Sequence, residues 1–173
     1  MSGERPNRYL RDIPLPGLGG PAGYRGPHVC EIVGISYRQL DYWTTTGLVS
    51  ASVRGADGSG TQRLYSFEDI VQLKVIKRLL DTGVSLQRIR SALEFVRDRG
   101  LDLRNVTLMS DGTTVYAADD DARIVDLLRS GQGVFAIAVE PLAQETEGEV
   151  ADLPREHAYE DPAVPSPPEV QSG

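Results

Sequence analysis

One short segment determines the predicted fold of this chain: Gly34-Ile-Ser-Tyr-Arg-Gln-Leu-Asp-Tyr-Trp43. The glycine favours a tight turn, and Ser36 followed three residues later by Gln39 is typical of a capping box at the start of a helix. In that helix Leu40 points inward. The outward positions are those of Tyr37, Arg38 and Asp41. The segment therefore predicts a turn followed by a short helix with a polar outer face.

The flanking residues complete a helix-turn-helix pattern. Residues 27–33 precede the turn and favour a two-turn helix with proline at its first position. Residues 50–65 follow the second helix, and their alternation around the glycine-rich loop 55–60 predicts a β-hairpin. Arginines lie on both arms, at Arg54 and Arg63. A hairpin in this position is called a wing.

Two further helices are expected to close the core beneath these elements. Ser66 and Asp69 resemble a capping box that opens a helix ending before Gly83. Ser85 caps the next helix, whose apolar residues repeat at steps of three and four as far as Gly100. Residues 24–100 therefore form a mostly α-helical domain with a β-hairpin wing.

Three blocks of this domain resemble the DNA-binding domain of the MerR family of transcription regulators. They are Ile35 to Val49, Arg63 to Ile70 and Gly83 to Ile89. The resemblance implies a bacterial regulator that binds an inverted-repeat promoter site in double-stranded DNA as a homodimer. It also implies that the protein distorts the DNA so that RNA polymerase holoenzyme can use the promoter. Such a protein is not an enzyme, and it works in the cytoplasm, associated with the nucleoid.

The candidate DNA contacts follow from this arrangement. Side chains at the start of a recognition helix reach base edges, which indicates Tyr37 and Arg38. The resemblance implies that Tyr42 holds a phosphate and that Arg54 and Arg63 grip the flanking DNA backbone.

Three positions have more specific interpretations. Asp41 stands where many relatives carry arginine, and we expect it to orient Arg38 or to accept from a cytosine amine. Tyr65 has two open interpretations, a core position or a contact with the DNA backbone. Trp43 is expected in the core, because an aromatic ring here can pack on the following helices.

The C-terminal half departs from the family pattern. No heptad run follows residue 100, so the usual dimerisation helix is not expected. Instead, residues 106–118 predict a strand pair around an Asp-Gly turn, residues 119–129 a helix and residues 134–139 a buried strand. This ββαβ order predicts a small α+β domain over residues 101–142. Because it has little core of its own, we expect it to mediate dimerisation or effector binding.

Composition separates the two halves and predicts disordered ends. The net charge is −7, but residues 24–99 hold 11 Lys+Arg against 8 Asp+Glu, whereas residues 100–173 hold 4 against 15. Positive charge is therefore concentrated where DNA binding requires it. Residues 1–23 are predicted to be a disordered leader without a signal peptide, and residues 143–173 an acidic, proline-rich disordered tail. No apolar run approaches the ~18 residues of a membrane helix.

Other kinds of site find little support in the sequence. It lacks a phosphate-binding loop and the motif of a serine hydrolase, so neither an enzyme nor a cofactor is predicted. The single cysteine, Cys30, argues against metal binding and favours an inert buried thiol. A small-molecule effector remains open. Two alternatives also remain, a monomeric architectural DNA binder of the excisionase type and a protein-binding module on a winged scaffold.

Overall fold

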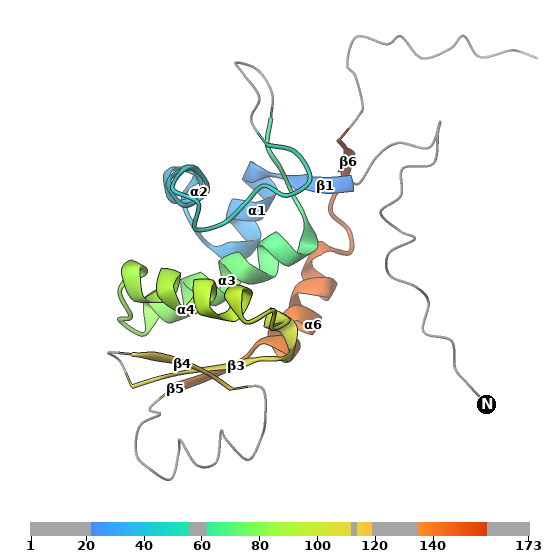
Figure 1. Cartoon of the computed structure of the whole chain (residues 1–173). Helices are drawn as coiled ribbons and strands as arrows, with labels where there is room; N and C mark the ends of the chain where they lie inside the picture. The colour runs from blue at the N-terminus through green and yellow to red at the C-terminus, as the bar shows by residue number, and fades with distance from the viewer. Residues whose placement is uncertain (1–21, 56–61, 112–113, 119–134, 159–173) are drawn as a thin grey trace, which may run out of the picture.

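The computed structural model describes residues 22–55, 62–111, 114–118 and 135–158, and Figure 1 shows their arrangement. The helices are α1 (Gly26–Val33), α2 (Tyr37–Thr45), α3 (Phe67–Asp81), α4 (Leu86–Asp98) and α6 (Val139–Val150), with the short 3₁₀-helix η2 (Leu103–Asn105). The strands are β1 (Ala22–Arg25), β2 (Leu64–Tyr65), β3 (Thr107–Ser110), β4 (Val115–Ala118), β5 (Phe135–Ala138) and β6 (Glu156–His157). The described chain is helix-rich, with two small antiparallel sheets.

The predicted turn between the first two helices is present. Gly34 ends α1 with a φ of 74°, and its N–H donates to the Cys30 carbonyl over 2.9 Å. At the start of α2, the Gln39 N–H donates to the Ser36 hydroxyl over 3.1 Å, and the Ser36 N–H donates to the Gln39 side chain over 3.0 Å. The capping box is therefore confirmed, and it satisfies two N–H groups that the helix itself leaves unpaired.

One continuous hydrophobic core holds the helices together. Buried apolar side chains from Tyr24 to Val150 belong to a single cluster, which includes Leu40 and Trp43 on the inner face of α2. Trp43 is 3% exposed, which confirms its predicted core position. The same cluster also contains Leu108 of β3 and Ile137 of β5. The described residues after Gly100 therefore share the core of the helix-turn-helix instead of building a separate one.

The region predicted as a wing is simpler than an extended hairpin. Its ladder within the described residues is one antiparallel bridge between Arg54 and Leu64. β2 pairs with β1 on its other side, in the register Tyr24 to Tyr65 and Arg25 to Leu64. The predicted loop tip, 56–61, lies outside the described residues.

The C-terminal strands form a sheet in the order β4-β3-β5. β3 and β4 are the predicted strand pair, and β5 pairs with β3 antiparallel, with Leu108 opposite Ile137. The helix predicted over 119–129 lies outside the described residues. The structure therefore contains the three strands of the predicted ββαβ unit but does not test its helix.

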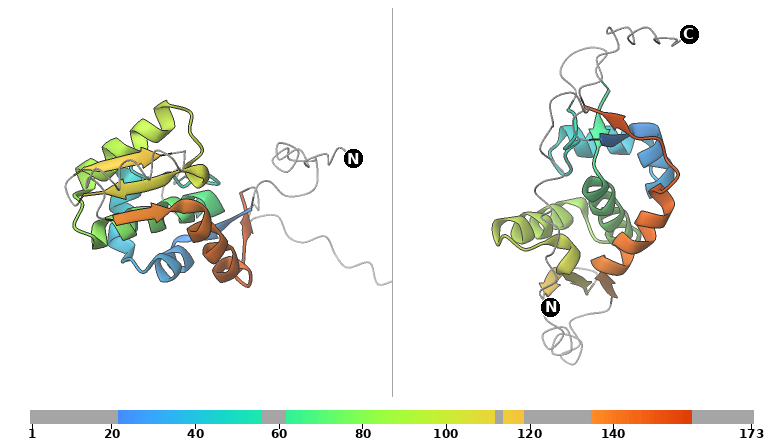
Figure 2. Two further views of the ribbon diagram at one scale, coloured as in Figure 1. Left: turned by 90° about the horizontal axis from the view of Figure 1, so that it is seen from below. Right: turned by 90° about the vertical axis from the view of Figure 1, so that its right-hand side faces the viewer.

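The prediction of a disordered tail from residue 143 is wrong for residues 143–158. Residues 139–150 form α6, which packs along α3, and β6 pairs with β1. Figure 2 shows α6 running between the two sheets. Its buried residues are Val139, Leu142, Ala143, Thr146 and Val150. Because Thr146 is polar, it interrupts the apolar pattern of these residues in the sequence. Its hydroxyl donates to the Leu142 carbonyl over 2.7 Å, so it is buried without leaving an unpaired polar group.

In the part of the chain that the structure describes, no helix is both long and apolar enough to cross a membrane.

Candidate nucleic-acid interface

The outer face of α2 carries the most exposed aromatic side chains of the described chain. Tyr37 is 62% exposed and Tyr42 is 56% exposed. Arg38 lies beside them, is also exposed and has no ion pair among the described residues. We call these three residues the α2 outer face. Exposed aromatic rings next to an unpaired guanidinium suit a surface that binds a partner with negative charges and flat groups.

Asp41 pairs with Arg63 and not with Arg38. The Arg63 guanidinium donates to the Asp41 carboxylate over 2.6 Å, which joins α2 to the residue before β2. The hydrogen bond from Arg63 to Asp41 raises the pKa of Arg63, while partial burial acts in the opposite direction. The partner that the structure gives Asp41 is therefore Arg63 and not Arg38, and sequence spacing within α2 does not reveal a partner 22 residues away. The expected contact of Asp41 with a cytosine amine stays a prediction.

Tyr65 lies in the core instead of on the surface. It is 1% exposed, and its hydroxyl is 3.0 Å from the Thr44 hydroxyl on α2. Burial is the main cause that raises the pKa of Tyr65. Of the two interpretations that the sequence left open, the structure thus supports the core position and argues against a contact with the DNA backbone.

Arg54 lies at the base of the loop 56–61. It is half-buried, and its Nε donates to the Gln62 carbonyl over 2.8 Å. This contact and the bridge to Leu64 hold the two ends of the loop together. Arg54 is therefore held beside the predicted wing and stays partly exposed as a residue.

Two contacts that the sequence did not indicate position α2 and the segment after it. Arg90 of α4 donates to the Thr46 carbonyl over 2.9 Å and to the Thr46 hydroxyl over 3.2 Å, which satisfies the C-terminus of α2. The Asp69 carboxylate accepts from the N–H of Ser52 over 2.8 Å and from its hydroxyl over 2.7 Å. The capping pattern around Asp69 was a visible signal, but its second partner depends on the tertiary fold.

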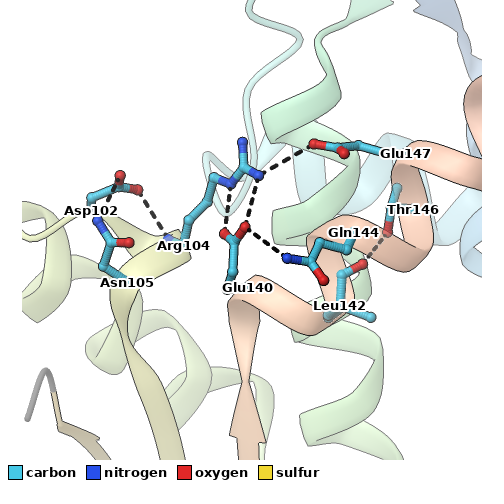
Figure 3. A network of polar contacts seen from close by, with 8 residues as sticks. All are labelled: Asp102, Arg104, Asn105, Glu140, Leu142, Gln144, Thr146 and Glu147. Atoms are coloured by element: carbon cyan, nitrogen blue, oxygen red, sulfur yellow. Dashed lines mark hydrogen bonds and ion pairs between the residues drawn. The ribbon is translucent and has the colours of Figure 1, made fainter. Parts of the chain in front are cut away.

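Several cations of α3 and η2 form ion pairs with α6. Lys74 of α3 is buried and pairs with Glu149, and Arg78 pairs with Glu145 over 3.2 Å. Arg104 of η2 pairs with Glu140 over 3.1 Å and with Glu147 over 3.3 Å, as Figure 3 shows. The hydrogen bond to Glu140 is the main cause that raises the pKa of Arg104. These cations bind acidic side chains of the same chain.

The described residues contain no cluster of three or more His, Cys, Asp and Glu side chains that could hold a metal ion. Cys30 is half-buried on α1, and burial raises the pKa of its thiol. A raised pKa keeps the thiol protonated near neutral pH, so Cys30 is a weak nucleophile and a weak metal ligand.

The geometry defines a helix-turn-helix domain whose second helix presents an exposed polar and aromatic face. Residues 24–96 match the family described as MerR HTH family regulatory protein. This part of the chain is therefore a MerR-type helix-turn-helix domain, as the sequence motifs predicted.

Similar proteins come from bacteria. The chain is 56% identical over 146 residues to a protein of Mycobacterium tuberculosis named "Uncharacterized HTH-type transcriptional regulator". That match covers 84% of this chain and 65% of the relative, so the chain spans somewhat less than two thirds of that protein. The chain is 33% identical over 69 residues to the "HTH-type transcriptional regulator HmrR" of Sinorhizobium medicae, a match that covers 40% of this chain and 45% of that protein. The "Heavy metal-dependent transcription regulator 1" of Rhizobium meliloti is 31% identical over 75 residues, a match that covers 43% of this chain and 49% of that protein.

Proposed function

We propose that this protein is a sequence-specific DNA-binding transcription regulator of the MerR type. The observation that carries the proposal is the α2 outer face, which lies on a capped helix within a domain that matches this family. The names of the relatives, which are transcriptional regulators, support it. A regulator of this kind works on the nucleoid, and we therefore place the protein in the cytoplasm.

In this proposal α2 is the recognition helix. Arg38 reads base edges in the major groove, because its guanidinium is exposed and unpaired among the described residues. Tyr37 packs against the groove, and the Tyr42 hydroxyl binds a phosphate. Arg54 and Arg63 lie beside the loop 56–61, which we propose as the wing, and they face the flanking DNA backbone.

Asp41 limits how strongly Arg63 attracts phosphate. Its carboxylate neutralises the Arg63 guanidinium at 2.6 Å. A contact between Arg63 and a phosphate then competes with this ion pair, so the surface around Arg63 binds generic DNA weakly. Binding consequently depends more on the contacts that Arg38 makes with bases.

We further propose that the protein binds an inverted repeat as a homodimer through residues 101–142. β4 and β5 are the outer strands of the described sheet, and outer strands carry backbone groups that can pair with a second copy. Two recognition helices about one helical turn of DNA apart would enter successive major grooves. Bending of the central base pairs would then contribute to specificity and would present the promoter to RNA polymerase holoenzyme.

Selection of bound sequences from a random duplex library, followed by a salt titration on the selected site, tests this function. We expect an enriched inverted repeat and an affinity that falls steeply with salt, because bound Lys and Arg release counterions from DNA. No enrichment, or a salt-independent affinity, would reject DNA binding and favour a protein-binding module.

Light scattering of the free chain and of its DNA complex tests the dimer. Two copies on one inverted repeat are expected. A monomer bound to a single half-site would favour an architectural DNA binder of the excisionase type.

A further inference from the structure

A pocket of about 480 Å³ lies beside the turn that ends α2. None of the candidate DNA-contacting residues lines it. Its walls come from residues 47, 48 and 50, from Gln72 of α3, from α4 and from residues 100–103. Leu48, Leu93 and Val96 line it and are at most 9% exposed, and Leu101 adds a half-buried apolar wall. A volume of this size falls in the range of ligand pockets. The pocket lining combines these apolar side chains with several polar and charged ones.

The polar lining selects the charge of a ligand. Arg90 and Arg97 both line the pocket from α4, two turns apart and therefore on one face of the helix. Arg97 is exposed and has no ion pair among the described residues. A guanidinium beside an apolar surface suits a carboxylate, which it can bind through two parallel hydrogen bonds.

Two acidic residues in the lining restrict the ligand further. The Asp102 carboxylate accepts from the Arg104 N–H over 3.0 Å and from the Asn105 side chain over 3.2 Å, so it is engaged in shaping η2 (Figure 3). Glu94 lines the pocket between the two arginines in sequence. Its negative charge and that of Asp102 disfavour a ligand with several negative charges.

We propose that this pocket binds a small organic monocarboxylate with an apolar body. The carboxylate lies between Arg97 and Arg90, and the apolar part packs on Leu48, Leu93 and Val96. The two acidic side chains disfavour a phosphate or a dicarboxylate, each of which carries more than one negative charge.

The pocket is physically connected to the recognition helix. Arg90 lines the pocket and donates to Thr46 through both of its terminal nitrogens. Gln72 also lines the pocket, and its amide donates to the Leu48 carbonyl over 3.1 Å. A carboxylate that takes the Arg90 donors competes with Thr46 for them and loosens the C-terminus of α2. Because α2 is the recognition helix in the proposed function, occupancy of the pocket changes DNA affinity.

Phenylacetate is a suitable probe, and phenylacetamide is its matched uncharged control. In NMR spectra of the whole 173-residue chain without DNA, millimolar phenylacetate should shift methyl signals of Leu48, Leu93 and Val96. Phenylacetamide should bind at least about tenfold more weakly, because it lacks the charge-assisted hydrogen bonds. Equal binding of acid and amide, or an absence of shifts in the pocket, would overturn the proposed site.

Variants of α4 locate the site independently of DNA. Arg97→Ala should weaken phenylacetate binding roughly tenfold. Glu94→Gln should strengthen it severalfold, because a nearby negative charge is removed. Arg88→Ala is the matched control, since Arg88 is exposed on the same helix but does not line the pocket. If Arg97→Ala and Arg88→Ala bound the probe equally well, Arg97 would not hold the carboxylate and the proposal would fail.

The connection to α2 is tested by DNA affinity with and without saturating phenylacetate. The expected change is about fivefold or more, the lower end of ordinary coupling between two sites. Arg90→Ala should abolish the change, since this variant lacks the contact that the ligand disrupts. Probe binding with an unchanged DNA affinity would reject the coupling. If the protein did not bind DNA at all, the proposed function would fail. The phenylacetate experiments without DNA would still test the pocket on their own.

Discussion

The outer face of α2 and the contact between α3 and α6 use the same kind of side chain for different purposes. On α2, Arg38 is exposed and unpaired among the described residues. On α3, Lys74 is buried against Glu149, and Arg78 pairs with Glu145. Both regions contribute to the positive charge of the N-terminal half. Only the first leaves its charge free for another molecule.

This difference shows that a count of charges along a sequence overstates the surface available to DNA. The acidic residues of α6 do not form a separate repulsive segment, because four of them pair with the cations of α3 and η2. Part of the positive charge therefore holds the chain together. Substitutions in the two regions should separate stability from DNA binding.

The largest effect is expected from Leu142→Ala on α6. Leu142 is 2% exposed, and truncation of a buried leucine typically costs about 3 kcal/mol of unfolding free energy. Gln144→Ala on the exposed side of the same helix is the control and should change stability by less than about 0.5 kcal/mol. Urea unfolding measures both. Similar small effects from both variants would mean that α6 is only loosely attached.

Glu149→Ala should have the next largest effect. It leaves the Lys74 ammonium, whose side chain is 9% exposed, without its counter-charge. We expect a loss of about 2 kcal/mol, because an unpaired buried charge is costly and Glu149 itself is only partly buried. Glu145→Ala is the matched control: its pair with Arg78 is exposed and should be worth less than about 1 kcal/mol. Equal losses in thermal or urea unfolding would contradict the buried character of the Lys74 pair.

Arg38→Ala should affect DNA binding and not stability, unlike the two α6 variants. Loss of a base contact should lower affinity for the selected site about tenfold, or roughly 1.4 kcal/mol, and should relax base preference. Arg78→Ala removes an arginine that is also exposed but is paired with Glu145, and it should leave DNA affinity nearly unchanged. Fluorescence anisotropy with the selected and scrambled duplexes compares the two. If both variants lost affinity alike, the distinction between free and paired cations would be mistaken.

The smallest effect concerns the pair between α2 and the wing base. Asp41→Asn should release Arg63 and strengthen binding to all duplexes about threefold. The slope of log affinity against log salt concentration should steepen by about the amount that one additional phosphate contact contributes. Arg63→Ala should have the opposite sign, because it leaves the Asp41 carboxylate unpaired near the DNA. Salt titrations on specific and non-specific duplexes measure both. A change restricted to the specific site would show that Asp41 contacts a base.

Local patterns predicted part of the candidate site well. Ser36 and Ser66 cap α2 and α3 as expected, because a cap depends on residues three positions apart. Contacts between distant segments were missed, including Arg63 with Asp41 and Arg90 with Thr46. Tyr65 was ambiguous because a tyrosine suits either a core or a surface, and its neighbours in the fold decided the matter.

The α6 helix illustrates the same limit. Its sequence is strongly acidic, and prolines cluster beyond Pro154, which together favoured a disordered tail from residue 143. The cations of α3 and η2 stabilise it from outside the segment. Such stabilisation depends on partners that lie between 36 and 75 residues away in sequence.

Residue patterns along the chain were enough to predict the helix-turn-helix motif and its resemblance to MerR-type domains, because capping residues, turn glycines and apolar spacing act within a few positions. The three-dimensional arrangement was needed to learn which cations are neutralised, how α6 packs and that Tyr65 is buried. These properties arise from contacts between segments far apart in the chain, and pairing, burial and desolvation do not exist until those segments meet.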